Sequence, residues 1–352
     1  MDNFEESPIS SVGRISVVIP MVNEAHNVER LVSDLAAQDF RGEVEILVAD
    51  GGSTDGSVDL LRTSADRAGL TITILENPAR LVAHGLNSCV ARATGDLIVR
   101  LDCKSHYPPD YLRRSAIASE ETGAWTIGGL LLTEGRTPTG RAVGSAMASP
   151  FGGLGWTRRT GTRRVEVDTV YLGAFRPEAF RRAGLFDPEM GDNHDEEFNI
   201  RVRQAGGRVV SDPAVRAYYT PPDSFERVFA RYFSYGFYKV PVMLKHRRIV
   251  TMRSLAPMAF LATSALLAPA ALRFPRARRM LAAELAVYAG AASAFGAASI
   301  VRRRERWGLL PRVILIFPTF HVAYALGMIE GLRRAIARPT TQTQRSDTPA
   351  RR

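Results

Sequence analysis

The sequence predicts an α/β fold: a doubly wound, mostly parallel β-sheet with helices on both faces, followed by C-terminal transmembrane helices. Up to about residue 217, short apolar runs alternate with amphipathic stretches, which predicts alternating strands and helices. The strand-like runs are almost wholly apolar, as expected for a parallel sheet that is covered on both faces. After residue 250 three long apolar runs follow, each near the ~20 residues that span a bilayer core.

The expected elements of the sheet alternate over residues 15–102. The run ISVVIP at 15–20 predicts a buried strand, and the apolar residues at 28, 31, 32 and 35 share one face of the helix that follows. The second strand, EILVAD, runs into the turn GGSTDG, whose glycines and small polar residues favour a tight reversal. Further along the chain we expect helices at 57–68 and 81–93 and strands at 71–76 and 96–102.

Polar side chains follow three of these strands. Asn23 and Glu24 come after the first strand. Asp50 ends the second strand, and Asp102 ends the fourth. Ligands of doubly wound sheets bind at the carboxyl ends of the strands, beside the topological switch point. We therefore expect these side chains to converge on one site.

The composition favours a membrane surface over nucleic acid as a partner of this chain. The formal net charge is +10, but much of the arginine clusters late in the sequence, around the apolar runs. The 2 cysteines, Cys89 and Cys103, are too few for a disulfide framework, so we expect them to be reduced. Residues 1–11 are acidic and polar and lack the apolar stretch of a secretory signal, so we expect the α/β domain to be cytoplasmic.

The three apolar runs are separated by basic connectors, as in membrane proteins. Residues 255–272 carry no charge, 280–301 carry only Glu284, and 309–329 carry Arg312 and His321. The connectors RFPRARR and VRRRER are both basic, so the positive-inside rule does not settle the orientation. We expect two or three membrane helices and a multi-pass protein of the cell inner (plasma) membrane.

The sequence thus predicts five parts. The segment after the α/β domain mixes aromatic and basic residues, which fits a helix lying among lipid headgroups or an ordinary packing helix. The parts are an N-terminal tail (1–14), the α/β domain (15–222), the amphipathic segment (223–250), the membrane region (251–332) and a basic tail expected to be disordered (333–352).

Five motifs carry a resemblance to a known family: SVVIPMVNE, LVADGGSTDGS, LNSCVARATGDLIVRLD, YPPDYL and NHDEEFNIRVRQAGGRV. In this order and spacing they resemble the serial motifs of family 2 inverting glycosyltransferases, which have the GT-A fold. The stretches VDTVYLGAFRPEAFRRAGLFD and ARYFSYGFYKVPVMLKHRR, with the late apolar runs, are similar to the succinoglycan-biosynthesis ExoA-like group. The resemblance runs from residue 15 to the last apolar run. It implies a membrane glycosyltransferase that uses a nucleotide sugar.

The resemblance implies a nucleotide pocket at the ends of the first two strands. Asp50 would hold the uracil of a UDP-sugar, since a carboxylate accepts a hydrogen bond from a base edge, and Gly51 would let the backbone approach. The alternative is that Asp50 only caps the helix at 57–68, although Asp55 is better placed for that. By the same resemblance the pocket is lined by Pro20, Asn23 and Glu24.

The motif LDCKSH departs from the family pattern at its second acid. By resemblance Asp102 would contact the ribose or a divalent cation (Mg2+ or Mn2+), and an acid two residues later would complete the cation site. That position holds Lys104, and an ammonium group cannot ligate a cation. Three interpretations stay open: Lys104 neutralises the departing diphosphate, His106 or His194 completes a metal site with Asp102, or the site is inactive.

The stretch DNHDEEFNIRVRQAGG predicts a helix with four acids in its first turns, where the helix dipole favours negative charge. By resemblance Asp195 is the catalytic acid of the family, and it follows a histidine where the family has Glu or Gln. An inverting transfer needs a general base that takes the proton of the acceptor hydroxyl as it attacks the anomeric carbon. Asp195 is the predicted base, and Glu197 is the second candidate.

The resemblance indicates transfer of one sugar to a lipid-linked saccharide in the synthesis of a cell-surface polysaccharide. Processive relatives carry a Q-x-x-R-W signature, and here the corresponding residues are Arg231, Ser234 and Tyr235. A basic face would favour the anionic polyprenyl diphosphate of the acceptor, in contact with membrane lipids. That face contains Lys245, Arg247 and Arg248. Two alternatives remain: a polyprenyl-phosphate glycosyltransferase, whose acceptor is the lipid phosphate, and a non-catalytic membrane subunit that retains the fold.

Overall fold

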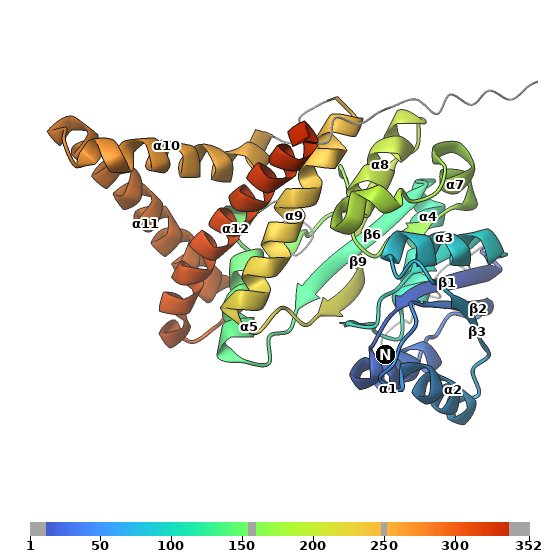
Figure 1. Ribbon diagram of the computed structural model, residues 1–352. Helices are drawn as coiled ribbons and strands as arrows, with labels where there is room; N and C mark the ends of the chain where they lie inside the picture. Colours follow the sequence, from blue (N-terminus) through green and yellow to red (C-terminus); the bar gives the residue numbers. More distant parts are fainter. Residues whose placement is uncertain (1–11, 154–159, 248–251, 338–352) are drawn as a thin grey trace, which may run out of the picture.

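The computed structural model describes residues 12–153, 160–247 and 252–337 (Figure 1). In these ranges the chain forms an α/β domain and a set of long C-terminal helices, so the expected fold class is confirmed. The expected N-terminal tail lies outside the described residues up to residue 11, and the expected basic tail does so from residue 338. Residues 248–251, at the end of the expected amphipathic segment, also lie outside them.

Four parallel strands form the first half of the sheet, in the order β3-β2-β1-β4. They are β1 (Arg14–Met21), β2 (Glu43–Asp50), β3 (Ile72–Glu76) and β4 (Leu97–Arg100). The chain adds β2 and β3 on one side of β1 and then returns to add β4 on the other side. The topological switch point therefore lies between the carboxyl ends of β1 and β4.

The second half of the sheet is mixed. Strands β6 (Thr126–Thr133) and β9 (Val209–Tyr219) run parallel to the first four, because the short strand β8 (Ala174–Phe175) pairs antiparallel with both β4 and β6. Two further short strands, β5 (Ser105–His106) and β7 (Val165–Glu166), pair antiparallel with β9. The β5 pairing brings the residues just after β4 beside the end of β9.

Helices cover both faces of the sheet, as the side chains of β1 show. Ile15, Val17 and Ile19 lie in one core with residues of α1, α2 and α4. Val18 lies in a second core with residues of α3, α7 and α8. Apolar residues at successive positions are what a strand buried on both faces requires. The helices are α1 (Ala25–Ala36), α2 (Ser57–Ala68), α3 (Val82–Arg92), α4 (Tyr111–Thr122), α7 (Pro177–Ala183) and α8 (His194–Gln204).

The remaining helices lie on the far side of β6 and β9 from the first four strands (Figure 1). The longer ones are α5 (Pro138–Met147), α9 (Phe225–Lys245), α10 (Ala256–Ala271), α11 (Pro275–Arg303) and α12 (Leu310–Ala337). Short 3-10 turns are η1 (Pro150–Gly152), η2 (Pro188–Asn193), η3 (Met252–Leu255) and η4 (Trp307–Leu309). Helix α12 continues past residue 332, so the first residues of the expected tail are helical.

Helices α9 and α12 pack side by side along their length (Figure 1). Glycines let the backbones touch: a Cβ added at Gly236 would lie 2.0 Å from the Tyr324 carbonyl oxygen, and one added at Gly327 would lie 2.1 Å from the Phe233 carbonyl oxygen. The Tyr232 and Phe320 rings stack at 3.8 Å. Small residues at such a helix crossing allow the close approach seen in membrane helix pairs.

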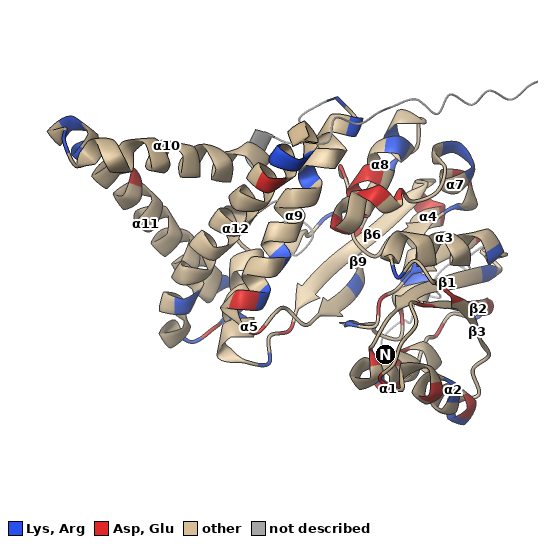
Figure 2. Cartoon of the chain, viewed as in Figure 1, with Lys and Arg blue, Asp and Glu red and all other residues tan. Residues whose placement is uncertain are grey.

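Helices α10 and α11 form a hairpin whose turn carries arginines and points away from the sheet (Figure 2). The other end of α11 is anchored to the α/β domain, where Arg303 donates to the Thr133 carbonyl oxygen. Leu266 and Val287 are 74% and 73% exposed. Two described helices, 275–303 and 307–337, are long and apolar enough to cross a membrane, and 22% and 44% of their most apolar stretches are buried. The second of them is thus more a part of the packed domain than the first. These helices suggest that the protein associates with a membrane.

Replacing Gly236 by leucine is expected to push α9 away from α12, because an added Cβ meets the backbone of Tyr324. Overpacking of this kind typically costs about 1–3 kcal/mol, so the midpoint of thermal unfolding in detergent should fall. Gly290→Ala in α11 is the matched control, since no atom lies within 4 Å of its added Cβ and alanine favours a helix. Equal midpoints for Gly236→Leu and the natural protein would contradict the close packing.

Candidate active site

The loops that follow β1 and β2 are bonded to each other at the switch point. The Asn23 backbone N–H donates to Ser53 Oγ (2.8 Å), and Asn23 Oδ1 accepts from the Thr54 N–H (2.9 Å). The Glu24 N–H donates to Ser57 Oγ (2.8 Å). Asn23 has a left-handed backbone (φ 51°), which asparagine tolerates better than most residues. The residues predicted to line the nucleotide pocket therefore belong to one ordered unit at the carboxyl edge of the sheet.

Asp50 shapes the turn after β2. Its Oδ2 accepts from the backbone N–H groups of Gly52 and Ser53 (both 3.0 Å), and its Oδ1 accepts from Ser53 Oγ (2.6 Å). Gly52 has φ +74°, a conformation that favours glycine. The carboxylate at the start of α2 is Asp55, which accepts from the Ser57 N–H at 3.1 Å. Asp50 thus holds the loop beside the switch point and not the helix.

Asp102 lies just after β4 and accepts hydrogen bonds on both oxygens. Oδ1 accepts from the backbone N–H groups of Lys104 (3.0 Å) and Ser105 (2.9 Å), and Oδ2 accepts from the Tyr171 hydroxyl. Burial and then the charge of Asp102 raise the pKa of Tyr171 well above its ordinary value, so the hydroxyl keeps its proton. Tyr171 therefore fixes the Asp102 carboxylate against the sheet.

Lys104 reaches across to the loop after β1. Its Nζ lies 3.1 Å from Glu24 Oε1, and the Lys104 side chain is 54% exposed whereas that of Glu24 is 10% exposed. Glu24 Oε2 accepts from Asn27 Nδ2 (2.7 Å), which holds the carboxylate in place. An exposed ammonium group thus lies two residues after Asp102 in the chain and contacts Glu24, which was predicted to line the nucleotide pocket.

His106 is turned toward α1. Its Nδ1 lies 2.7 Å and 2.8 Å from the two oxygens of Asp34, which also accepts from the Tyr107 N–H (3.0 Å). The His106 ring packs 5.7 Å from that of Tyr218. This contact joins α1 to the short strand β5.

A buried ion pair links β4 to the start of α8. Arg100 is 4% exposed, and its Nη1 donates to Asp195 Oδ1. The same nitrogen lies 3.0 Å from His194 Nε2, and His194 Nδ1 lies 2.5 Å from the Gly191 carbonyl oxygen. Since a carbonyl only accepts, His194 carries its proton on Nδ1 and offers Nε2 to Arg100. Burial lowers the pKa of His194, although the charge of Asp195 acts in the opposite direction, and the smaller effect of Arg100 lowers it further, so the ring is neutral.

The other acids of α8 are bound to α9. Buried Lys239 contacts both oxygens of Glu196 at 2.6 Å. Fully buried Glu197 lies 2.8 Å from both Arg201 Nη2 and Lys245 Nζ. Lys245, which was predicted on a basic face, is exposed and forms ion pairs with Asp187 and Glu197 where α9 packs on α8. Glu197, the second candidate for the base, is enclosed by cations and holds two helices together.

The structure does not bring the two histidines predicted as metal ligands to Asp102. Both oxygens already accept hydrogen bonds, and the residue two positions later is a cation. His194 uses Nε2 for Arg100, and His106 faces Asp34. Within residues 12–153, 160–247 and 252–337, no group of three or more His, Cys, Asp or Glu could hold a metal ion. The metal roles of Asp102, His106 and His194 remain predictions.

Two residues of this site, Arg100 and Tyr171, were not expected from the sequence. An arginine inside the apolar run DLIVRL is a signal that could have identified the first, because a charge in a buried strand needs a buried partner. Tyr171 has no local signal, since its partner Asp102 is 69 residues away. A hydroxyl so remote in sequence is placed only by the fold.

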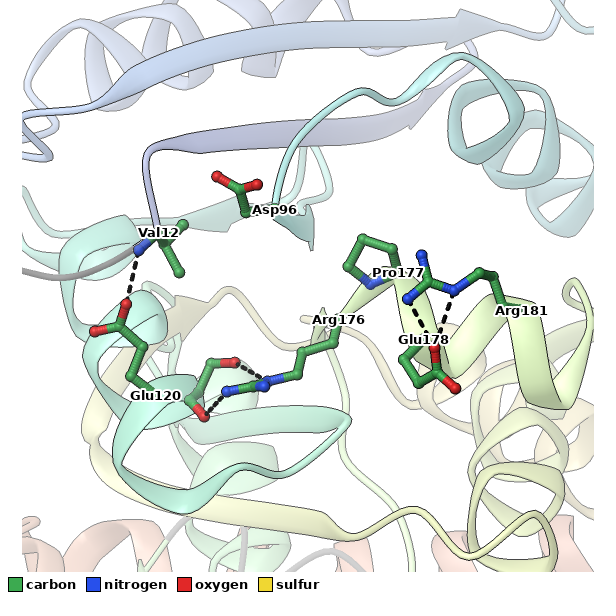
Figure 3. Close-up of a pocket in the computed structure, with 8 residues that line it drawn as sticks. Val12, Asp96, Glu120, Arg176, Pro177, Glu178 and Arg181 are labelled. Carbon is green, nitrogen blue, oxygen red and sulfur yellow. Dashed lines mark hydrogen bonds and ion pairs between the residues drawn. The ribbon is translucent and has the colours of Figure 1, made fainter.

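A hollow of about 350 Å³ lies at the opposite edge of the sheet, near the start of β4 and α7 (Figure 3). Its polar side chains have partners within the protein. Arg176 donates to Ser119, and Arg181 to Glu178. The hollow therefore shows no group that calls for a ligand, and the candidate site is the carboxyl edge of the sheet.

Replacing Glu197 by glutamine is expected to destabilise the fold, because it leaves Arg201 and Lys245 without the buried carboxylate they share. Breaking a buried pair typically costs about 3–5 kcal/mol. Burial alone would raise the pKa of Glu197, but its hydrogen bonds to Arg201 and Lys245 outweigh this and lower it. The stabilisation is therefore complete above the ordinary carboxyl pKa and is lost as the pH falls below it.

Thermal unfolding of the natural protein and of the Glu197→Gln variant between pH 7 and pH 4 measures this pH-dependent stabilisation. The difference in midpoint should be largest near neutral pH and should shrink toward pH 4. Glu178→Gln is the control, since Glu178 pairs with Arg181 and Arg182 on the exposed surface and should matter little. A difference that grows on acidification would contradict the assigned ion pairs.

Comparisons with known proteins agree with this geometry. The sequence model of Glycosyl transferase family 2 matches residues 16–165. The succinoglycan biosynthesis protein ExoA of Rhizobium meliloti (strain 1021) is 30% identical over 243 residues, which cover 68% of this chain and 73% of ExoA. The dolichyl N-acetyl-alpha-D-glucosaminyl phosphate 3-beta-D-2,3-diacetamido-2,3-dideoxy-beta-D-glucuronosyltransferase of Methanococcus voltae is 23% identical over 232 residues, covering 63% of this chain and 71% of that protein.

A solved structure supports the fold. The mannosyltransferase PcManGT from Pyrobaculum calidifontis, in complex with GDP-Man and Mn2+, matches with a TM-score of 0.59 at 21% identity, covering 93% of this chain and 91% of PcManGT. This likeness establishes a GT-A-type fold. The resemblance noted in the sequence motifs is confirmed by the family match and by the similarity to ExoA. The chain belongs to glycosyltransferase family 2 and is an ExoA-like glycosyltransferase.

Proposed function

We propose that the enzyme transfers one sugar from a UDP-sugar to a lipid-linked saccharide, with inversion at the anomeric carbon, in the synthesis of a cell-surface glycan. One observation carries the proposal: Asp102 and Asp195 lie on either side of the contact between Arg100 and Tyr171. Tyr171 binds Asp102, Arg100 binds Asp195, and Arg100 Cζ is 5.6 Å from the centre of the Tyr171 ring. A donor held at Asp102 would have its reacting carbon on the side of Asp195.

The uridine would bind at the loops after β1 and β2. Asp50 Oδ1 accepts one hydrogen bond, from Ser53. A carboxylate oxygen has two lone pairs, so Oδ1 can accept a second bond from the N–H of a uracil ring. Gly51 and Gly52 carry no side chain that would keep the base from this backbone. Pro20, Asn23 and Glu24 would form the facing wall.

Lys104 would supply positive charge to the departing diphosphate. Its side chain is mostly exposed, and its present partner is a single oxygen of Glu24 at 3.1 Å. A diphosphate carries more negative charge than one carboxylate, so it would compete for the ammonium group. The bond from the anomeric carbon to the diphosphate oxygen breaks in the transfer, and the charge left on that oxygen is stabilised by a fixed cation. The departure from the family pattern at Lys104 would thus replace one cation by another.

Asp195 would act as the general base. Arg100 holds the carboxylate in one orientation. The acceptor oxygen bonds to the anomeric carbon, its proton passes to Asp195, and UDP leaves from the opposite face. A positioned base typically contributes about 10²–10⁴-fold to the rate.

The acceptor would be presented at the cytoplasmic face of the inner (plasma) membrane by a polyprenyl diphosphate. The exposed apolar side chains of α10 and α11 support insertion of this hairpin in a bilayer. The arginines at its turn would contact lipid headgroups. The Methanococcus voltae relative is named for a dolichyl-linked sugar phosphate, and ExoA for the biosynthesis of a polysaccharide. A multi-pass arrangement would require α12 as well, which lies against the α/β domain.

Asp195→Asn is expected to lower turnover by about 10²–10⁴-fold, the usual contribution of a positioned base. The amide oxygen still accepts from Arg100, but the buried arginine loses its counter-charge, so the thermal midpoint should fall while the folded protein keeps its affinity for UDP. Release of UDP from a panel of UDP-sugars, with membrane extract as the source of acceptor, gives the turnover, and titration with UDP gives the affinity. Normal turnover in the Asp195→Asn variant would refute the assignment of the base.

Turnover of the natural protein is expected to persist in EDTA, because Lys104 supplies the positive charge. Lys104→Ala should lower it by about 10²–10³-fold, as for loss of one group that stabilises developing charge, and Lys104→Arg should keep most of it. Lys104→Asp restores the family pattern and should make turnover depend on Mn2+ or Mg2+. Complete loss of turnover in EDTA, with recovery in Mn2+, would overturn the ammonium hypothesis.

The product decides between acceptors. A lipid that gains one sugar on an existing saccharide supports the proposed function. A sugar attached directly to a polyprenyl phosphate would instead assign the protein to the sister class of polyprenyl-phosphate glycosyltransferases.

A further inference from the structure

Arg231 differs from the other cations around the site. Arg100, Lys104 and Lys239 each have a carboxylate partner. Arg231, a half-buried residue of α9, forms no ion pair with any residue that the structure describes. A guanidinium group cannot shed its charge to avoid this cost. An arginine that is half-buried and without an anion is poised to receive one from a ligand.

The surroundings of Arg231 are aromatic. Its Cζ lies 5.9 Å from the centre of the Tyr235 ring, one turn further along α9. Tyr235, and to a smaller extent Tyr219 and Tyr171, raise the pKa of Arg231 against the effect of burial. Hydroxyls and ring faces favour the cation without neutralising it. The charge is therefore kept and remains available.

The nearby acid Asp192 is held by another residue. Ser234, on the same face of α9 as Arg231, donates its hydroxyl to Asp192 Oδ2. Asn193 donates to the Tyr235 carbonyl oxygen at 3.0 Å, which fixes the start of α8 against this turn of α9. Asp192 thus acts on Arg231 through its charge and does not form an ion pair with it. No carboxylate among the described residues therefore accounts for the position of the Arg231 guanidinium.

The turn of α9 that carries Arg231 and Tyr235 lies against the start of α8, because Asn193, two residues before Asp195, donates to the Tyr235 carbonyl oxygen. Tyr219 stands opposite Ser105 in the β5–β9 ladder, and the Ser105 N–H donates to Asp102 Oδ1 at 2.9 Å. Tyr171 donates to the other oxygen of Asp102. Two tyrosines that act on Arg231 therefore border Asp102, where the donor is proposed to bind.

The next residue of α9 faces the apolar helices. Tyr232 stacks on Phe320 of α12 at 3.8 Å, and one turn earlier Phe229 is 37% exposed. Arg231 thus sits where the polar site meets an apolar helix pair. A ligand that combines phosphate with a hydrocarbon chain matches both sides of this boundary.

We propose that Arg231 binds a phosphate group of the lipid carrier and so places the acceptor hydroxyl beside Asp195. The planar guanidinium can give two parallel N–H bonds to phosphate oxygens, and Tyr235 keeps water from the cation. The role of this phosphate site in placing the acceptor rests on the proposed function, whereas the site itself rests on the surroundings of Arg231. The same guanidinium could also bind the diphosphate of the donor. Binding measurements with a lipid diphosphate and with UDP distinguish these two sources of phosphate.

Binding is measured with the full-length protein in detergent, using farnesyl diphosphate, UDP and farnesol as probes. Arg231→Gln is expected to lower the affinity for farnesyl diphosphate at least about tenfold, because a charge-assisted pair of hydrogen bonds is lost. The affinities for UDP and farnesol should not change. A lower affinity for UDP with an unchanged affinity for farnesyl diphosphate would overturn the assignment to the lipid carrier and place the donor phosphate at Arg231. Unchanged affinity for both phosphates would overturn the site itself.

Two further variants keep the test decisive. Arg227→Gln, one turn earlier on α9, removes an exposed arginine that pairs with Asp223 at 3.1 Å, and it should change no affinity. Arg231→Lys keeps the charge but not the two parallel bonds, and it should weaken farnesyl diphosphate by less than Arg231→Gln. It also replaces Arg231→Gln if that variant does not fold, and unchanged affinity would then reject the site. Because binding needs no turnover, a protein that binds farnesyl diphosphate through Arg231 but transfers no sugar would reject only the proposed function.

Discussion

The buried ion pair between Arg100 and Asp195 is the interaction on which the geometry of the site depends. A charge inside an apolar strand is tolerated only with a partner, and α8 supplies both a carboxylate and a neutral imidazole. The same guanidinium packs on Tyr171, which holds Asp102. One buried charge therefore sets the distance and orientation between the carboxylate at the edge of the sheet and the carboxylate at the start of a helix.

Helix α9 connects the active site to the apolar helices, because it contacts both α8 and α12. On one side, Lys239 and Lys245 bind the acids of α8. On the other side, its backbone touches that of α12 through glycines. Buried ion pairs add little net stability but allow few alternative arrangements. The glycine contacts bring two backbones together and leave no room for a side chain between them. The two kinds of contact complement each other: the charges hold α9 on α8, and the glycines fix the distance between α9 and α12.

The sequence predicted what depends on local pattern. The strands and helices of residues 15–102 follow from apolar runs and turn residues, and the convergence of Asp50 and Asp102 on one edge follows from the topology. Contacts between remote residues were not predictable. Arg100 and Asp195 are 95 residues apart, and nothing near Lys245 in the sequence shows that it will pair with Glu197. For the same reason β8, with two residues, escaped prediction although it joins the two halves of the sheet.

The close packing of α9 and α12 has a consequence for the choice of substrate. Under the proposed function the apolar helices contact a bilayer, and α12 is joined backbone to backbone to α9, which packs on the active-site helix α8. The fold would then fix the height of the active site above the bilayer. A lipid-linked glycan moves its growing end away from the membrane with each added sugar. Under the proposed function, the length of the acceptor becomes a criterion of recognition, and the enzyme selects its step in an assembly sequence by geometry as well as by the chemistry of the sugar.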